Sequence, residues 1–234
     1  MTLSERLFGD SSHAGPFGFD YESSAHAVLF YLDENFLLNV LCEFISASLK
    51  AGNGALVIAT ASHQKALIEK LSQGGMDVGA LKSKGSYVAI DANEVLSKFE
   101  GDGNPDLAQL NRLMSGAIAG ISKTLQPAGK RVTVFGELVA LMWERRQFEA
   151  VLAVEDFWER LASSLPFTLL CGYPITEFSA PGTEEAFVRI CGTHSMLIPP
   201  DSYSTPLAER RLLEATARSY SNSRLMEAAE ETPG

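Results

Sequence analysis

The chain has 234 residues, of which 46% are hydrophobic and 21% are charged, proportions that are typical of a folded globular protein. Its formal net charge is −10, and no run of Lys and Arg is longer than an adjacent pair such as Lys130-Arg131. Direct nucleic-acid binding is therefore not expected, because it depends on clustered cations that neutralise phosphates.

The sequence also argues against membrane contact and secretion. No apolar run approaches the roughly 20 residues of a membrane-spanning helix, and the start of the chain lacks the basic residues and apolar run of a signal peptide. The cysteines Cys42, Cys171 and Cys191 are odd in number and widely spaced, a pattern typical of free thiols in a reducing compartment. We therefore expect a cytoplasmic protein.

Residues 1–24 show no periodicity and are expected to form a flexible leader. Short apolar runs then recur along the chain, the pattern of strands buried on both faces. These runs are Ala27–Leu32, Ala55–Thr60, Val88–Ile90, Val132–Phe135 and Phe167–Cys171, with a late strand at Ser195–Ile198.

Helical periodicity lies between the apolar runs. Residues 34–51 carry apolar side chains at spacings of three and four after Asp33, which is expected to cap the helix, and Ser62 is expected to cap the next helix. Further helices are predicted after Asp91, over Asp106–Leu125, after Glu137, from Phe148 to Leu161 and after Pro181.

Strands that alternate with helices predict a three-layer α/β fold, with a mainly parallel sheet and helices on both faces. We expect this domain to span residues 25–204. Residues 205–234 turn charged and polar and are predicted to form a C-terminal helical extension that ends in a polar tail.

Ligands of open parallel sheets bind beyond the carboxyl ends of the strands. A phosphate-binding loop would read GxxxxGK[ST] there. After the first predicted strand the chain instead has Asp33 and Glu34 and no glycine, and these carboxylates would repel a phosphate at a helix N-terminus. Nucleotide hydrolysis is therefore not expected.

Glu137 follows the fourth predicted strand, directly after Gly136. Its place at this edge of the sheet favours a ligand-facing role. A Glu in the first turn of a helix also complements the helix dipole, so a purely structural role stays open.

The sequence offers little support for a metal site or a catalytic nucleophile. A tight metal site needs four ligands, usually from closely spaced pairs, and the only such pair is Cys191 with His194. Cys42 and Cys171 fall in apolar segments and are expected to be core residues. No serine lies in a GxSxG turn. We therefore expect no catalytic residue, no metal and no cofactor.

Five segments, in their order and spacing, resemble the MEDS domain, a sensory domain shared by methanogen proteins and the dichloromethane-responsive regulator of methylotrophs. They are His26–Tyr31, Val134–Val139, Leu141–Trp143, Leu170–Pro174 and Ile190–Ser195. The resemblance covers roughly residues 26–203.

The resemblance implies a fold similar to the RecA and KaiC ATPases with a degenerate phosphate loop, and a role in sensing. The implied partners are an unknown small-molecule ligand and an output protein, either a histidine kinase or a transcription regulator. The helix after Pro206 would then serve as a linker remnant, a homodimerisation element or a docking segment. The residues expected to bind the ligand are His26, Tyr31, Asp33, Glu137, Tyr173 and His194.

Three functions stay open from the sequence. The favoured one is a non-catalytic sensory domain that binds a small ligand or a protein partner and relays its state to a regulatory output. The second is a nucleotide-binding or nucleotide-hydrolysing enzyme on a degenerate RecA-like scaffold, which the missing phosphate loop disfavours. The third is a pure protein-interaction module.

Overall fold

The structure is a computed structural model, and it describes residues 26–99, 106–179 and 183–200. The leader predicted over residues 1–24 and the extension predicted over residues 205–234 lie outside the described residues, as does the predicted end of the domain near residue 204.

The described residues form a six-stranded sheet with the order β3-β2-β4-β5-β1-β6, in which every neighbouring pair is parallel. The strands are β1 (His26–Tyr31), β2 (Gly54–Ala59), β3 (Tyr87–Asp91), β4 (Val132–Gly136), β5 (Phe167–Pro174) and β6 (Met196–Ile198). All five apolar runs and the predicted late strand lie in this one sheet, so the predicted architecture is confirmed.

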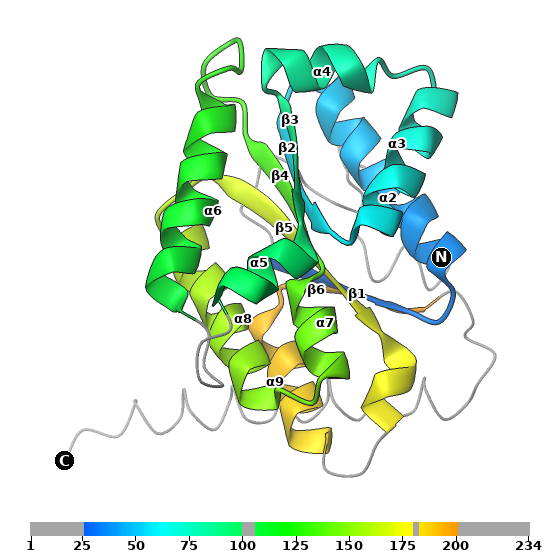
Figure 1. The fold of residues 1–234 in the computed structure, drawn as a ribbon, viewed down its shortest axis with the longest axis vertical. Coiled ribbons are helices and arrows are strands. Elements are labelled where there is room, and N and C mark those ends of the chain that lie inside the picture. The colour runs from blue at the N-terminus through cyan, green and yellow to red at the C-terminus, as the bar shows by residue number, and fades with distance from the viewer. Residues whose placement is uncertain (1–25, 100–105, 180–182, 201–234) are drawn as a thin grey trace, which may run out of the picture.

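Helices cover both faces of the sheet (Figure 1). One face packs against α2 (Glu34–Lys50), α3 (Ala61–Gln73) and α4 (Val78–Lys84). The other face packs against α5 (Ala92–Phe99), α6 (Leu107–Ser122), α7 (Leu138–Glu144), α8 (Phe148–Ala162) and α9 (Glu184–Thr193), with a 3-10 helix, η2 (Ile175–Ser179), after β5.

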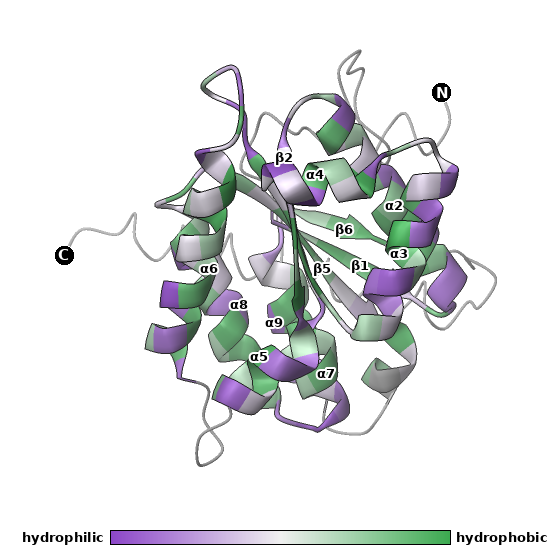
Figure 2. Cartoon of the chain, turned by 45° about the horizontal axis from the view of Figure 1, so that its top comes forward, coloured by the Kyte–Doolittle hydropathy of each residue, from purple (hydrophilic) through white to green (hydrophobic). Residues whose placement is uncertain are grey.

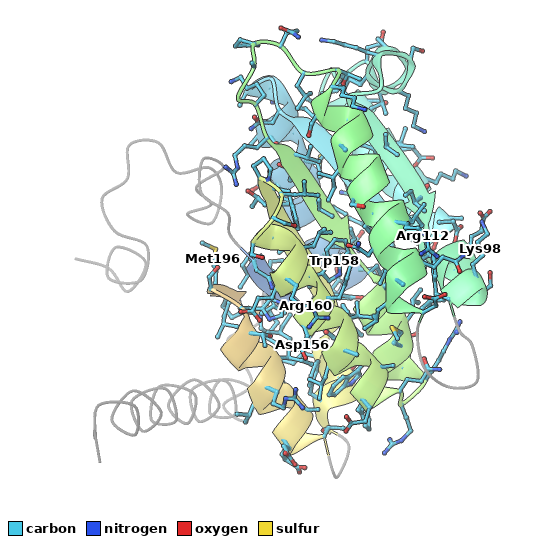
Figure 3. All side chains as sticks on the ribbon, turned by 90° about the vertical axis from the view of Figure 1, so that its left-hand side faces the viewer. Lys98, Arg112, Asp156, Trp158, Arg160 and Met196 are labelled. Carbon is cyan, nitrogen blue, oxygen red and sulfur yellow. The ribbon has the colours of Figure 1, made fainter. Side chains whose placement is uncertain are left out.

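Because both faces are covered, most side chains of the strands are apolar. Every residue of β1 and of β2 is buried, and the strands are mostly in the hydrophobic colour of Figure 2. The helices alternate instead. In α8, Val151, Val154 and Trp158 are buried, whereas Arg160 is exposed and Asp156 is half-buried on the outer side (Figure 3).

The order of the strands explains how the helices divide between the faces. From β1 the chain moves to β2 and then to β3 at one edge, and the connecting helices α2, α3 and α4 lie on one face. From β3 it returns towards the other edge through β4, β5 and β6, and the connecting helices lie on the opposite face. A sheet whose parallel crossovers share one hand has this distribution, since the connection changes face when it changes direction.

Two details of the helices differ from the sequence prediction. The second helix is capped by Thr60, whose side-chain oxygen accepts a hydrogen bond from the amide of His63, and Ser62 lies inside its first turn. The helix α4 was not predicted, because it is short and buries only Val78. It begins with a cap by Asp77 and ends at Gly85, which has a positive φ of 76° that glycine adopts without strain.

None of the helices in the described part of the chain combines the length and the apolar character needed to span a membrane.

We expect Gly54→Ala to lower the free energy of unfolding. A Cβ at Gly54, the first residue of β2, would overlap Cγ2 of Ile121 in α6, and such overpacking typically costs about 1–3 kcal/mol. Gly116, also in α6, faces open space, so Gly116→Ala should raise the stability by roughly 0.5–1 kcal/mol. Urea unfolding of both variants measures this, and equal destabilisation by the two would contradict the packing of α6 on β2.

Candidate functional site

The carboxyl ends of β2 and β4 lie side by side at one edge of the sheet. These strands are neighbours, but the helices that follow them, α3 and α7, lie on opposite faces of the sheet. Helices that leave in opposite directions open a crevice between two strand ends, where open α/β sheets bind their ligands. Thr60 follows β2 and Glu137 follows β4.

Glu137 joins the two sides of this edge. Its side chain is buried, with only 3% of the residue exposed. The amide of Thr60 donates to its Oε2 at 2.8 Å, and Nδ1 of His63 lies 2.6 Å from its Oε1. Glu137 makes no side-chain cap on α7, the helix it precedes. Its carboxylate instead lies at the N-terminus of α3, where the helix dipole favours a negative charge.

His63 extends this contact towards the surface. Its ring is 11% exposed, and its Nε2 lies 3.9 Å from Oε1 of Glu34, whose side chain is 77% exposed. The hydrogen bond to Glu137 raises the pKa of His63, although burial of the ring acts in the opposite direction. We call Thr60, His63 and Glu137 the Glu137 edge.

Two more of the expected ligand-binding residues follow β1 or end it. Tyr31 is buried, and its pKa is raised first by that burial and then by the charges of Glu137, Glu144 and Glu34, so its hydroxyl keeps its proton. Asp33 is the N-cap of α2, and its Oδ1 accepts hydrogen bonds from two backbone amides of that helix. Its carboxylate therefore caps the N-terminus of α2.

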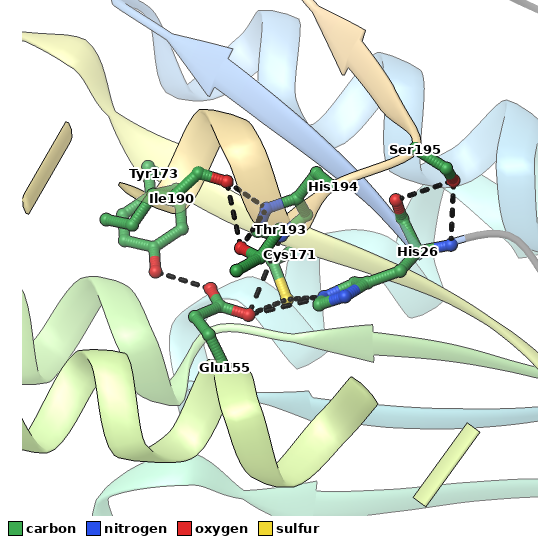
Figure 4. Close-up of polar contacts among 8 residues, drawn as sticks. All are labelled: His26, Glu155, Cys171, Tyr173, Ile190, Thr193, His194 and Ser195. Carbon is green, nitrogen blue, oxygen red and sulfur yellow. Dashed lines mark hydrogen bonds and ion pairs between the residues drawn. The ribbon is translucent and has the colours of Figure 1, made fainter. Parts of the chain in front are cut away.

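A second group of polar side chains lies inside the protein, between the sheet and α8 and α9 (Figure 4). It consists of Glu155 from α8, His26 from the start of β1, Cys171 and Tyr173 from β5, and His194 directly after α9. We call these five residues the Glu155 centre. All five are buried, and Glu155 and Cys171 have no exposed surface.

The carboxylate of Glu155 is the hub of this centre. The hydroxyl of Tyr173 donates to Oε1 at 2.5 Å. Around Oε2 lie Nε2 of His26 at 3.2 Å, Nε2 of His194 at 3.6 Å and Sγ of Cys171 at 3.7 Å.

The electrostatic balance of the centre keeps a charge on Glu155. Burial alone would raise the pKa of this carboxyl, but the interactions with His194, His26 and Tyr173 outweigh it, so the pKa lies below its usual value. Burial lowers the pKa of His194 to about 4, and it raises the pKa of the Cys171 thiol well above the usual value. The carboxylate of Glu155 is thus enclosed in the core beside two imidazole rings and a thiol.

The six residues predicted to bind a ligand fall into two separate groups. Tyr31, Asp33 and Glu137 lie at or near the carboxyl edge of the sheet, whereas His26, Tyr173 and His194 belong to the Glu155 centre. The structure therefore does not bring them together into one pocket.

Sequence reasoning did not find the Glu155 centre. Cys171 was expected to be a core residue, and it is buried in the core, but its place beside Glu155 was not predicted, and Glu155 was not singled out. A signal for Glu155 did exist: it lies four residues after Val151 and three before Trp158, inside the buried stripe of α8, where a carboxylate is rare without a partner. Spacing along the chain could not reveal the set, because His26, Glu155, Cys171 and His194 come from four separate segments.

These four residues could together hold a metal ion, since one ligand atom from each lies within 4.8 Å of all the others. Cys191, the expected neighbour of His194, is not in this set.

The raised pKa of His63 predicts how stability depends on pH. A group whose pKa is higher in the folded protein contributes its full stabilisation below its unfolded value, about 6.5 for histidine, and loses it as the pH rises through the folded value. We expect the wild-type protein to lose stability relative to His63→Asn as the pH rises from about 6.5 through the raised pKa of His63. Urea unfolding across this range measures the difference, and parallel profiles for the two proteins would show that the pair with Glu137 does not titrate.

Comparison with known proteins places the chain in a family. A search among curated proteins found no match. The family described as MEDS, the MEthanogen/methylotroph, DcmR Sensory domain, matches residues 25–194, a region that holds both the Glu137 edge and the Glu155 centre. Because this match covers well over half of the chain, the protein belongs to the MEDS family of sensory domains.

Proposed function

We propose that this chain is a non-catalytic sensory domain that binds a small uncharged or cationic molecule at the Glu137 edge and relays the bound state to a regulatory partner. The observation that carries the proposal is the buried Glu137 carboxylate, which lies where parallel sheets bind ligands and bonds to groups on the opposite side of that edge. Membership of a sensory family supports the role.

The charges around the edge favour this class of ligand. Glu34, Glu137 and Glu144 all act on Tyr31 and on His63, so an anionic ligand would meet several negative charges at close range. A cationic or uncharged ligand would not. Tyr31 can donate a hydrogen bond to such a ligand, since its hydroxyl stays protonated.

A nucleotide would also find its usual phosphate positions taken. Phosphates bind to free backbone amides at helix N-termini. At the start of α2 these amides donate to Asp33, and at the start of α3 the amide of Thr60 donates to Glu137. Both arrangements disfavour the alternative of a nucleotide-hydrolysing enzyme.

The same contacts supply a route for relaying the signal. Glu137 precedes α7 on one face of the sheet, and its carboxylate bonds to Thr60 and His63 of α3 on the other face. A ligand that competes with His63 for Oε1 would loosen this link and let α3 and α7 move independently. The output partner of this change would be a histidine kinase or a transcription regulator that contacts one of these helices.

We expect small amines or small uncharged metabolites to raise the melting temperature of the full chain, and ATP with Mg²⁺ to leave it unchanged. A ligand that binds only the folded state raises its apparent stability, by about 2.7 kcal/mol at 100 times its Kd. A thermal-shift screen with these compounds makes the comparison. Micromolar binding of ATP by calorimetry, or phosphate release by the purified protein, would instead establish the enzyme alternative.

Glu137→Gln should abolish the response to any compound found in this way. The buried carboxylate also holds two hydrogen bonds, so the variant is expected to lose roughly 1–3 kcal/mol of stability, and binding is best measured by calorimetry well below its melting temperature. Glu69→Gln, on the exposed side of α3, makes the same change of charge and should bind normally. Unchanged affinity in Glu137→Gln would place the ligand elsewhere.

A further inference from the structure

Four side chains of the Glu155 centre bring their ligand atoms to separations close to those of a tetrahedral metal site. In a tetrahedral zinc site with bond lengths of about 2.0–2.3 Å, neighbouring ligand atoms lie roughly 3.3–3.7 Å apart. Oε2 of Glu155 is 3.2 Å from Nε2 of His26, 3.6 Å from Nε2 of His194 and 3.7 Å from Sγ of Cys171. Nε2 of His26 is 3.5 Å from Sγ of Cys171. Four of the six distances between the ligand atoms are thus close to those of such a site, and the other two, from Nε2 of His194 to His26 and to Cys171, are within 4.8 Å.

The orientation of the His194 ring also supports a metal site. Its Nδ1 lies 2.6 Å from the carbonyl oxygen of Ile190, so the single N–H of a neutral ring donates there. Nε2 is then left with a lone pair that faces the carboxylate of Glu155, and it has no hydrogen-bond partner among the described residues. Two electron-rich atoms that face each other in a dry interior are unfavourable unless a proton or a metal cation lies between them, and a metal ion fills this role.

The charges of the four side chains match a divalent ion. A thiolate from Cys171 and the carboxylate of Glu155 carry one negative charge each, and two neutral imidazoles carry none. With a divalent cation the site is neutral overall, which removes most of the cost of enclosing charge in the core.

The groups behind two of the ligands, Glu155 and His194, are also those of a metal site. Metal-bound histidines commonly donate their second N–H to a backbone carbonyl, and metal-bound carboxylates are themselves hydrogen-bonded. His194 donates to Ile190 in this way, and Tyr173 donates to Oε1 of Glu155, the oxygen that does not face the other ligands (Figure 4).

We propose that His26, Glu155, Cys171 and His194 bind one zinc ion in a closed tetrahedral site. Zinc fits best because nitrogen, sulfur and carboxylate ligands in a tetrahedron are its preferred set, and four protein ligands leave no open position for catalysis. The ion links the start of β1, β5, α8 and the segment between α9 and β6. It therefore stabilises the half of the sheet that lies away from β3.

The site is independent of the ligand proposed above. Its four ligands lie in the layer beneath α8 and α9, and none of them belongs to the Glu137 edge. A small-molecule screen without a hit would not contradict the zinc proposal. A protein without zinc would not contradict the proposal that a ligand binds at the Glu137 edge.

The test uses the full chain and two metal ions as probes. We expect about one zinc per chain by elemental analysis of protein purified without chelators. After removal of zinc, added Co²⁺ should produce a thiolate-to-cobalt charge-transfer band in the near ultraviolet and the intense visible bands of tetrahedral cobalt. A folded wild-type protein that retains no zinc and gives no such spectrum would overturn the proposal, as would stoichiometric iron or copper in place of zinc.

Variants locate the ion. Cys171→Ser should remove the charge-transfer band, whereas Cys191→Ser, which changes another buried cysteine outside the set, should keep it. Tyr173→Phe keeps all four ligands and should weaken zinc binding about 10–100-fold in competition with a chromogenic chelator. A band that persists in Cys171→Ser would place the ion elsewhere and overturn the proposal, and the wild-type measurements decide the question if a variant fails to fold.

Discussion

The carboxylate of Glu155 lies in the core with no exposed surface, and the surrounding structure must compensate its charge. Removing an ionised carboxylate from water costs several kcal/mol unless close partners replace the lost hydration. Those partners come from β1, β5 and the end of α9. The contacts that compensate this one charge therefore hold three distant segments together beneath α8, in addition to their apolar packing.

Two buried carboxylates with different surroundings thus lie in one domain, and we propose a different task for each. The partners of Glu155 are all buried, so the centre is closed and suited to holding an ion and fixing the fold. Glu137 bonds instead to His63, which is partly exposed and approaches the exposed Glu34. Because solvent and solutes can reach that ring, the proposed ligand response is assigned to the Glu137 edge, and the proposed ion that holds the sheet and its helices together is assigned to the Glu155 centre.

The sequence predicted the sheet well, because strands buried on both faces are largely apolar: every residue of β1 and β2 is buried, and β1 is a short apolar run apart from His26 at its start. It also predicted the cap by Asp33, since capping depends on neighbours along the chain. The short helix α4 was missed because it has almost no apolar face. The Glu155 centre was missed because its members are neighbours only after the strands have taken their order, and that order cannot be read from local patterns. The likeness to RecA and KaiC stays a prediction.

Anomalous X-ray diffraction from crystals of the full chain, measured above and below the zinc absorption edge, tests the central claim most directly. The account predicts one strong anomalous peak among Nε2 of His26, Nε2 of His194, Oε2 of Glu155 and Sγ of Cys171, at distances of about 2.0–2.3 Å from each. Well-ordered density for these four side chains with no anomalous signal between them would contradict it.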